Sequence, residues 1–186
     1  MLTDAMGCAG IAVETELTLE AVAARTHADP AALARARQLY EAARGADALD
    51  ARPCDIFALW PTQATAASVP TSFDVTVVAP CSQRALEEAL RTCAVGSAIG
   101  KAEEGKHRAA PALAAVGAAC HPLAFSTNGR LSDSTARFVE HLARRWGRAK
   151  GWAHSLALPR LLQNISMAIQ RFNGQIFAEA SGRARG

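Results

Sequence analysis

Short segments in which apolar and polar residues alternate predict the strands of this protein. Residues 10–19 (GIAVETELTL) set Ile11, Val13, Thr15 and Leu17 against Glu14, Glu16 and Thr18, which is the pattern of a half-buried strand or of a strand running into a helix. Residues 55–60 (DIFALW) and 73–80 (FDVTVVAP) also predict strands, and the polar, proline-bounded segment between them is typical of an elaborated hairpin. Residues 118–129 (AACHPLAFSTNG) predict another strand, ending in an Asn-Gly turn.

Apolar residues at helical spacing predict the remaining elements. Residues 29–45 begin with Asp29 as an N-cap and Pro30 at the first helical position, and Gly45 ends the pattern. Residues 82–119 are helical in pattern, with an apolar stripe from Leu86 to Ala94, but they contain Gly96, Gly100, Gly105 and Pro111. Glycine costs about 1 kcal/mol and proline about 3 kcal/mol in a helix interior, so two helices or one kinked helix are expected. Residues 132–151 and 155–180 predict two further helices before a polar tail.

Strands followed by helices in this order predict an α/β fold, a mixed sheet flanked by helices. The 186 residues, 50% of them hydrophobic, suffice for one sizeable core. We therefore expect a single domain over residues 1–186, with a core at about 10–130 and a C-terminal helical extension at about 131–180. The net charge of +3 and the pI near 8.8 permit a nucleic-acid partner without requiring one.

The five cysteines contain no CxxC pair and no zinc-finger spacing with histidine. Cys54, Cys81 and Cys93 are expected to be small core residues, and the thiols to be reduced. His121 follows Cys120 directly, but neighbouring strand residues point to opposite faces, so a packed or surface histidine is expected rather than a zinc ligand. No segment has the apolar length of a membrane span, and residues 1–12 lack the features of a signal peptide. An intracellular protein, nuclear or cytoplasmic, without membrane partner or zinc site is expected.

Asp55, Asp74 and Lys106 form a candidate constellation for phosphodiester chemistry. Mg²⁺ keeps several waters and takes one or two carboxylates directly, and a nearby lysine can orient the attacking water and stabilise developing charge. Glu14 or Glu16 could supply a further acid. Ordinary structural interpretations stay open as well: Asp55 as a turn residue, Asp74 on a solvent-facing strand edge, Lys106 paired with Glu103 on a helix surface, and both glutamates on the wet face of a strand.

Four segments in order carry a resemblance to a known family: RPCDIFALW (52–60), FDVTVVAP (73–80), KAEEGKHRAA (101–110) and CHPLAFSTNG (120–129). Together they resemble the restriction-endonuclease-like domain found downstream of reverse transcriptase in some non-LTR retrotransposons, a member of the PD-(D/E)xK nuclease superfamily. The match covers residues 10 to 129, with looser similarity at 164–173. Each motif is short, so its specificity lies in order and spacing.

The resemblance implies a PD-(D/E)xK nuclease-like sheet and a Mg²⁺-dependent endonuclease that nicks DNA. Asp55 and Asp74 would be metal ligands, Lys106 the catalytic lysine displaced onto a helix, and Glu16 the auxiliary acid. DNA is the implied partner. The chain could belong to a longer reverse-transcriptase polyprotein, although it carries no reverse-transcriptase signature of its own.

The chain departs from the family pattern at four places: Cys54 before the first aspartate, Ala109–Ala110 where a lysine and a tyrosine are usual, Pro111 inside a helix that is normally continuous, and Ser126 in place of an acid. The acid pair is intact. A second interpretation therefore stays open, in which the same fold is a catalytically inactive nucleic-acid-binding or interaction module.

A basic segment, RRWGRAKGW (144–152), is a candidate nucleic-acid surface. It combines Arg144, Arg145, Arg148 and Lys150 with two tryptophans, which suits phosphate contacts and base stacking. Arg52 and Arg171 are further candidates. The alternative is an ordinary helix end, with cations near the C-terminus, Gly147 and Gly151 terminating the helix, and the tryptophans facing the core.

Overall fold

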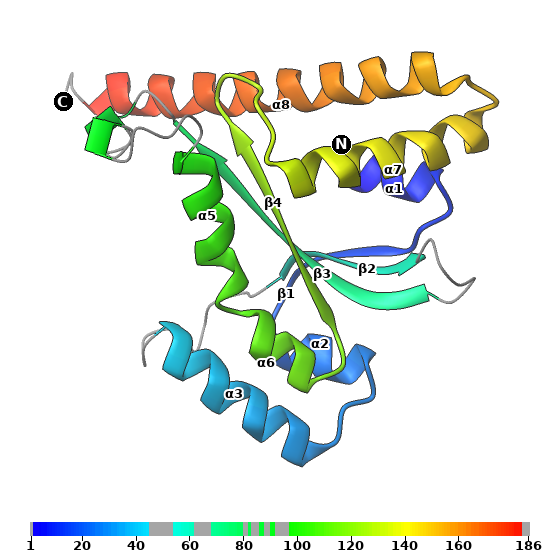
Figure 1. The fold of residues 1–186 in the computed structure, drawn as a ribbon, viewed down its shortest axis with the longest axis vertical. Coiled ribbons are helices and arrows are strands. Elements are labelled where there is room, and N and C mark those ends of the chain that lie inside the picture. Colours follow the sequence, from blue (N-terminus) through cyan, green and yellow to red (C-terminus); the bar gives the residue numbers. More distant parts are fainter. Residues whose placement is uncertain are drawn as a thin grey trace. The chain divides into compact units, whose positions relative to one another are not determined.

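The protein has a mixed α/β fold in this computed structural model, which describes residues 2–44, 54–61, 68–79, 82, 86–87, 90–91 and 97–183 (Figure 1). The strands form one four-stranded mixed sheet in the order β1-β2-β3-β4: β1 Val13–Leu17, β2 Cys54–Pro61, β3 Ser68–Val78 and β4 Ala119–Ser126. The helices are α1 Leu2–Cys8, α2 Leu19–Arg25, α3 Pro30–Arg44, α5 Ser97–His107, α6 Ala110–Ala115, α7 Asp133–Lys150 and α8 His154–Arg183. The predicted α/β class is confirmed, and the specific nuclease arrangement stays a prediction.

The chain divides into two compact units. One comprises residues 10–76 and 100–124, and the other comprises residues 1–9, 77–99 and 125–186. Among the helices of the described ranges, none is both long enough and apolar enough to cross a membrane.

The unit of residues 10–76 and 100–124 is built on the predicted strand–helix start. β1 runs into α2 through Thr18, whose hydroxyl accepts a hydrogen bond from the Ala21 amide at 3.3 Å. Asp29 caps α3 as predicted, because its Oδ1 accepts from the Ala32 amide at 2.7 Å. The core of this unit is a cluster of buried residues from α2, α3, β2, α6 and the α6–β4 turn: Leu19, Val22, Ala23, Ala36, Tyr40, Cys54, Phe57, Ala109, Ala112, Leu113, Val116 and Ala118.

β2 and β3 form the predicted hairpin, and β3 starts earlier than the pattern predicts. The antiparallel register runs from Ile56 opposite Phe73 to Pro61 opposite Ser68. Residues 68–72, predicted as part of the connection, pair with β2, and Thr71 and Ser72 are buried despite their polar side chains. Backbone pairing therefore overrode the turn-like composition of this segment. A longer hairpin fixes the relative position of the two strands more firmly.

The predicted interruption of the helical segment 82–119 is confirmed. α5 ends at His107, α6 begins at Ala110, and Pro111 lies in the first turn of α6, where a missing amide is tolerated. The predicted apolar stripe from Leu86 to Ala94 lies mostly outside the described residues. Its two described leucines, Leu86 and Leu90, are exposed.

α7 and α8 form an antiparallel pair in the other unit, and α8 continues past the start of α7 (Figure 1). At about 1.5 Å per residue, the 18 residues of α7 span about 27 Å and the 30 of α8 about 45 Å. The buried stripe of α8, from Ala157 to Ile169, is followed by Phe172, which is 56% exposed. The C-terminal part of α8 thus presents apolar side chains to solvent.

Gly151 and Gly147 have different roles at the end of α7. Gly151 ends the helix in the left-handed conformation (φ 68°), as predicted. The prediction that Gly147 also terminates the helix is wrong, because Gly147 lies inside α7 and is buried. A β-carbon there would meet Ala157 Cβ at 3.0 Å and the Trp152 carbonyl oxygen at 3.1 Å, so its smallness permits the close approach of the α7–α8 turn.

The Gly147→Val variant is expected to lower the free energy of unfolding by about 1–3 kcal/mol, because both neighbours of the new side chain are rigid. Gly174→Val in α8 is the matched control: no atom lies within 4 Å of its β-carbon position, and a change within about 0.5 kcal/mol is expected. Urea unfolding followed by circular dichroism measures both. Equal stability of the two variants would contradict the close-packing role.

Candidate active site on strands β2 and β3

Asp55 and Asp74 come together because they lie on paired strands. Ile56 is opposite Phe73, and one further step along the same antiparallel register sets Asp55 opposite Asp74. Directly opposed residues have β-carbons about 4.5–5.5 Å apart. The Asp55 carboxylate is held in place by the Val75 amide, which donates to Asp55 Oδ2 at 2.7 Å. This amide is a contact that no sequence motif indicates, since it depends on the strand register.

Lys106 reaches this pair from α5. Its Nζ lies 2.6 Å from Asp74 Oδ1, forming a charge-assisted hydrogen bond. The Asp74 side chain is 4% exposed, and the Lys106 side chain is 27% exposed. Water is therefore largely excluded from Asp74 but still reaches Lys106. The structure therefore brings together all three members of the predicted constellation.

Asp74 is in an environment that works against its ionisation. Burial is the largest influence and raises its pKa, and the contact with and charge of Lys106 lower it. The Asp55 carboxylate raises the pKa of Asp74 again, both through its charge and as hydrogen-bond partner of the protonated form. The net shift of the Asp74 pKa is upward, and perturbed pKa values of this kind are common at functional sites.

Glu16 occupies the next strand beside Asp55. Thr15 is opposite Ile56 and Leu17 opposite Cys54, so the register sets Glu16 level with Asp55. Its backbone has φ 56°, an uncommon conformation for a residue other than glycine. The described residues contain no group of three or more His, Cys, Asp or Glu placed to hold a metal ion, and the role of Glu16 as auxiliary acid stays a prediction. Glu14 instead pairs with Arg25 at 2.7 Å.

Aromatic side chains pack around Phe73, the residue that precedes Asp74 in β3. The Phe73 ring contacts Trp60 and His121 edge-on, with centroids 5.4 and 5.6 Å apart. His121 is thus a packed histidine, as predicted, and burial lowers its pKa while Glu103 raises it and His107 lowers it. Cys54 is a buried core residue, as predicted: burial raises the pKa of its thiol to about 11. Cys8, Cys54 and Cys120 are free thiols; Cys81 and Cys93 lie outside the described residues.

The predicted nucleic-acid residues lie in different surroundings. Arg144, Arg148 and Lys150 are exposed near the end of α7, Arg145 is half-buried, and Arg52 lies outside the described residues. The two tryptophans follow the helix-end interpretation. Trp146 is 9% exposed and packs edge-on against Trp152 at 5.2 Å, and the Arg160 guanidinium lies 5.2 Å from the Trp152 ring. Trp146 is therefore not available for base stacking.

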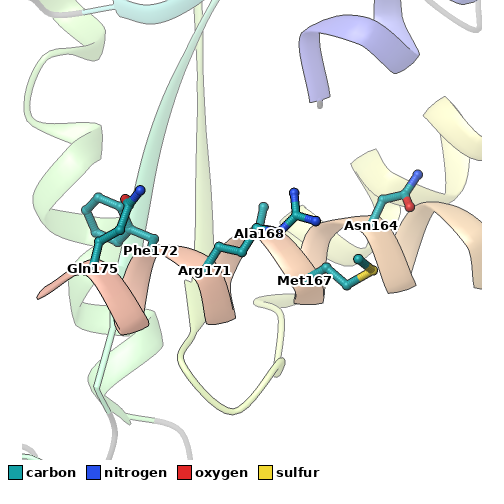
Figure 2. Close-up of a pocket in the computed structure, with 6 residues that line it drawn as sticks. All are labelled: Asn164, Met167, Ala168, Arg171, Phe172 and Gln175. Carbon is teal, nitrogen blue, oxygen red and sulfur yellow. The ribbon is translucent and has the colours of Figure 1, made fainter. Parts of the chain in front are cut away.

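Arg171 lies on the C-terminal half of α8, where side chains of one helix line a shallow pocket of about 350 Å³ (Figure 2). The lining residues are Asn164, Met167, Ala168, Arg171, Phe172 and Gln175. Met167 and Phe172 are exposed, and no acid lines the pocket.

None of the protein-family models, curated proteins or solved structures compared with the chain matches it.

Proposed function

We propose that this protein is a Mg²⁺-dependent DNA endonuclease of the restriction-endonuclease-like type, of retrotransposon origin, with Asp55 and Asp74 as metal ligands and Lys106 as the catalytic lysine. One observation carries the proposal: two aspartates on paired strands are opposed, and a lysine ammonium lies 2.6 Å from one of them. Aspartate is disfavoured in strands, and like charges directly opposite each other are destabilising, so this pair has a cost that a function would explain.

The donor set fits Mg²⁺. The ion prefers hard oxygen ligands and binds through one or two carboxylates while keeping several waters. Ionised Asp55 and Asp74 carry two negative charges against one positive charge of Lys106, and a divalent cation would offset the excess. The contacts with Val75 and Lys106 use one oxygen of each carboxylate, Asp55 Oδ2 and Asp74 Oδ1. When bound, the ion would supply Lewis-acid charge at the scissile phosphate and lower the pKa of a water.

The residues of the chain would divide the remaining work. The Val75 amide keeps the Asp55 carboxylate oriented toward its neighbour, so no reorganisation is needed on binding. Lys106 favours the ionised form of Asp74 against the effect of burial, and its partly exposed ammonium can donate to a phosphate oxygen or to the attacking water.

Nicking of supercoiled plasmid DNA by the purified protein tests the proposal. Conversion to the open circle is expected with Mg²⁺ and is expected to stop on addition of EDTA. The Asp55→Asn variant, purified in parallel, controls for contaminating nuclease. The absence of Mg²⁺-dependent nicking by the wild type, or equal nicking by the variant, would refute the proposed nuclease activity.

A second candidate is a catalytically inactive nucleic-acid-binding module. It is favoured by the same contacts, because Val75 and Lys106 already stabilise the two carboxylates without a metal. DNA binding that weakens with salt, without cleavage under any divalent cation, would support this alternative over the nuclease.

A further inference from the structure

The outward face of α7 carries a row of basic side chains. Arg137, His141, Arg144 and Arg148 are spaced four, three and four residues apart, which places them on one side of a helix. At about 1.5 Å per residue the row is about 16 Å long. The buried residues of α7, including Phe138, Leu142 and Trp146, lie between these positions and face the opposite side.

The charges on this face are close to one another. Burial is the largest influence on His141 and lowers its pKa, and the charges of Arg145, Arg144 and Arg148 lower it further. Arg144 pairs with Glu140 at 2.8 Å, and both side chains of this pair are exposed. An exposed ion pair contributes little, so the face keeps a net positive charge.

The surrounding sequence adds to this charge. Residues 125–186 contain ten lysines and arginines but only three acids. Residues 1–124 contain ten lysines and arginines and fourteen acids. The +3 net charge of the chain therefore hides a strongly basic C-terminal part, and such an asymmetry is typical of proteins that bind polyanions.

We propose that Arg137, Arg144 and Arg148, with His141 between them, form a sequence-independent binding surface on α7 for the phosphodiester backbone of duplex nucleic acid. Guanidinium groups bind phosphate oxygens through paired N–H donors, and the row extends over several phosphate spacings. Base reading is not expected, because Phe138 and Trp146, the phenylalanine and the tryptophan of α7, are both buried. This surface shares no residue with the Asp55–Asp74 pair and would bind whether or not that pair cleaves DNA.

Nucleic acid fits this face better than an anionic membrane does. Helices that bind membranes place large apolar side chains beside their basic residues. No large hydrophobic residue of α7 is exposed; its exposed neighbours are small or charged, such as Ala136 and Ala149. The surface is therefore suited to a polyanion that stays in water.

Binding should also take up a proton at His141. Phosphates that neutralise Arg144 and Arg148 remove two of the charges that lower the His141 pKa, so its pKa rises on binding. A pKa that rises on binding makes binding tighter as the pH falls. The helices packed on α7 do not contribute to this shift: Asp4 and Cys8 of α1 and His154 and Arg160 of α8 are not among the groups that act on His141.

The test is fluorescence anisotropy with a labelled DNA duplex of arbitrary sequence, in EDTA, over a range of salt concentrations. The triple variant Arg137→Ala, Arg144→Ala, Arg148→Ala is expected to bind at least about tenfold more weakly, and its salt slope to fall by roughly 0.9 for each lost phosphate contact. The matched control removes the same charge elsewhere, by Arg25→Ala, Arg35→Ala and Arg37→Ala, all exposed positions, and is expected to bind nearly as the wild type does. Circular dichroism checks that both variants are folded.

Three results would overturn the proposal: equal weakening by both triple variants, binding whose salt slope is unchanged in the α7 variant, or equally strong capture of vesicles of anionic phospholipid or of polyglutamate. An NMR titration of the His141 ring gives an independent readout. Its pKa is expected to rise when the duplex is added to the wild type, and an unchanged pKa would show that the phosphates bind elsewhere.

Discussion

The Lys106→Met variant is expected to unfold more easily than the wild type by about 3 kcal/mol near neutral pH, because removing one member of a buried ion pair leaves a charge that burial disfavours. Asp74 is 4% exposed and loses the ammonium that lies 2.6 Å from its Oδ1. Methionine keeps most of the length of the lysine side chain, so lost packing contributes little. Urea unfolding in EDTA measures the difference.

The loss should depend on pH in a defined direction. Burial and Asp55 raise the pKa of Asp74, and Lys106 lowers it, so in the variant this pKa rises further above the ordinary value of 3.8. A carboxyl group whose pKa is higher in the folded state lowers stability as the pH rises above 3.8. The destabilisation is therefore greatest at neutral pH and disappears as the pH falls below 3.8, because Asp74 is then protonated in both the folded and the unfolded state.

Two further variants isolate the ion pair. Lys101→Met removes an exposed lysine from the same helix and is expected to change the free energy of unfolding by less than about 0.5 kcal/mol. Adding Asp74→Asn to Lys106→Met removes the unpaired charge and is expected to restore most of the stability. If Lys106→Met and Lys101→Met have the same free energy of unfolding at neutral pH, the contact between Lys106 and Asp74 does not persist in solution.

Much of the fold follows from local patterns in the sequence. The period-two segment at residues 10–19 became β1 followed by α2, and Asp29 capped α3, because alternation and capping depend on neighbouring residues only. The Asn-Gly turn after β4 is present for the same reason, with Gly129 at φ 82°. Pro111 separated two helices because it lacks an amide.

What the sequence did not predict depends on contacts between distant residues. Residues 68–72 look like a connection, yet they are strand because β2 offers them partners. Gly147 looks like a helix terminator, yet it lies inside α7 because Ala157 and the Trp152 carbonyl approach it across the turn. In both cases tertiary packing decided against local preference.

In the candidate site, too, some features follow from the sequence and others depend on contacts between distant residues. The order of motifs singled out Asp55, Asp74 and Lys106, and the structure brings these three together. The amide of Val75 and the edge-on contact of Phe73 with His121 could be found only from the strand register and packing. The row of Arg137 and His141 with Arg144 and Arg148 has a visible helical spacing, but only the structure shows that this side of α7 is the outward one.

The Asp55→Asn variant is expected to lose at least about 10³-fold in nicking rate, because a metal ligand contributes several kcal/mol to transition-state stabilisation and each 1.4 kcal/mol is about a factor of ten. Its stability is expected to be unchanged or higher by several tenths of a kcal/mol, roughly the cost of opposed like charges in a sheet. The amide oxygen of asparagine can still accept from the Val75 amide, which donates to Asp55 Oδ2 at 2.7 Å. Plasmid nicking and urea unfolding measure the two effects on the same preparation.

Asp55→Ala separates charge from hydrogen bonding. It removes the acceptor as well, so the Val75 amide loses its partner and stability is expected to fall by about 1–3 kcal/mol, with the same loss of nicking. Asparagine keeps the hydrogen bond to the Val75 amide, and alanine does not. If the two variants were nevertheless destabilised equally, the charge of Asp55 would itself stabilise the fold. If asparagine left stability intact and removed activity, the two opposed carboxylates would be kept against their mutual repulsion for the metal, because no structural gain would account for the second charge.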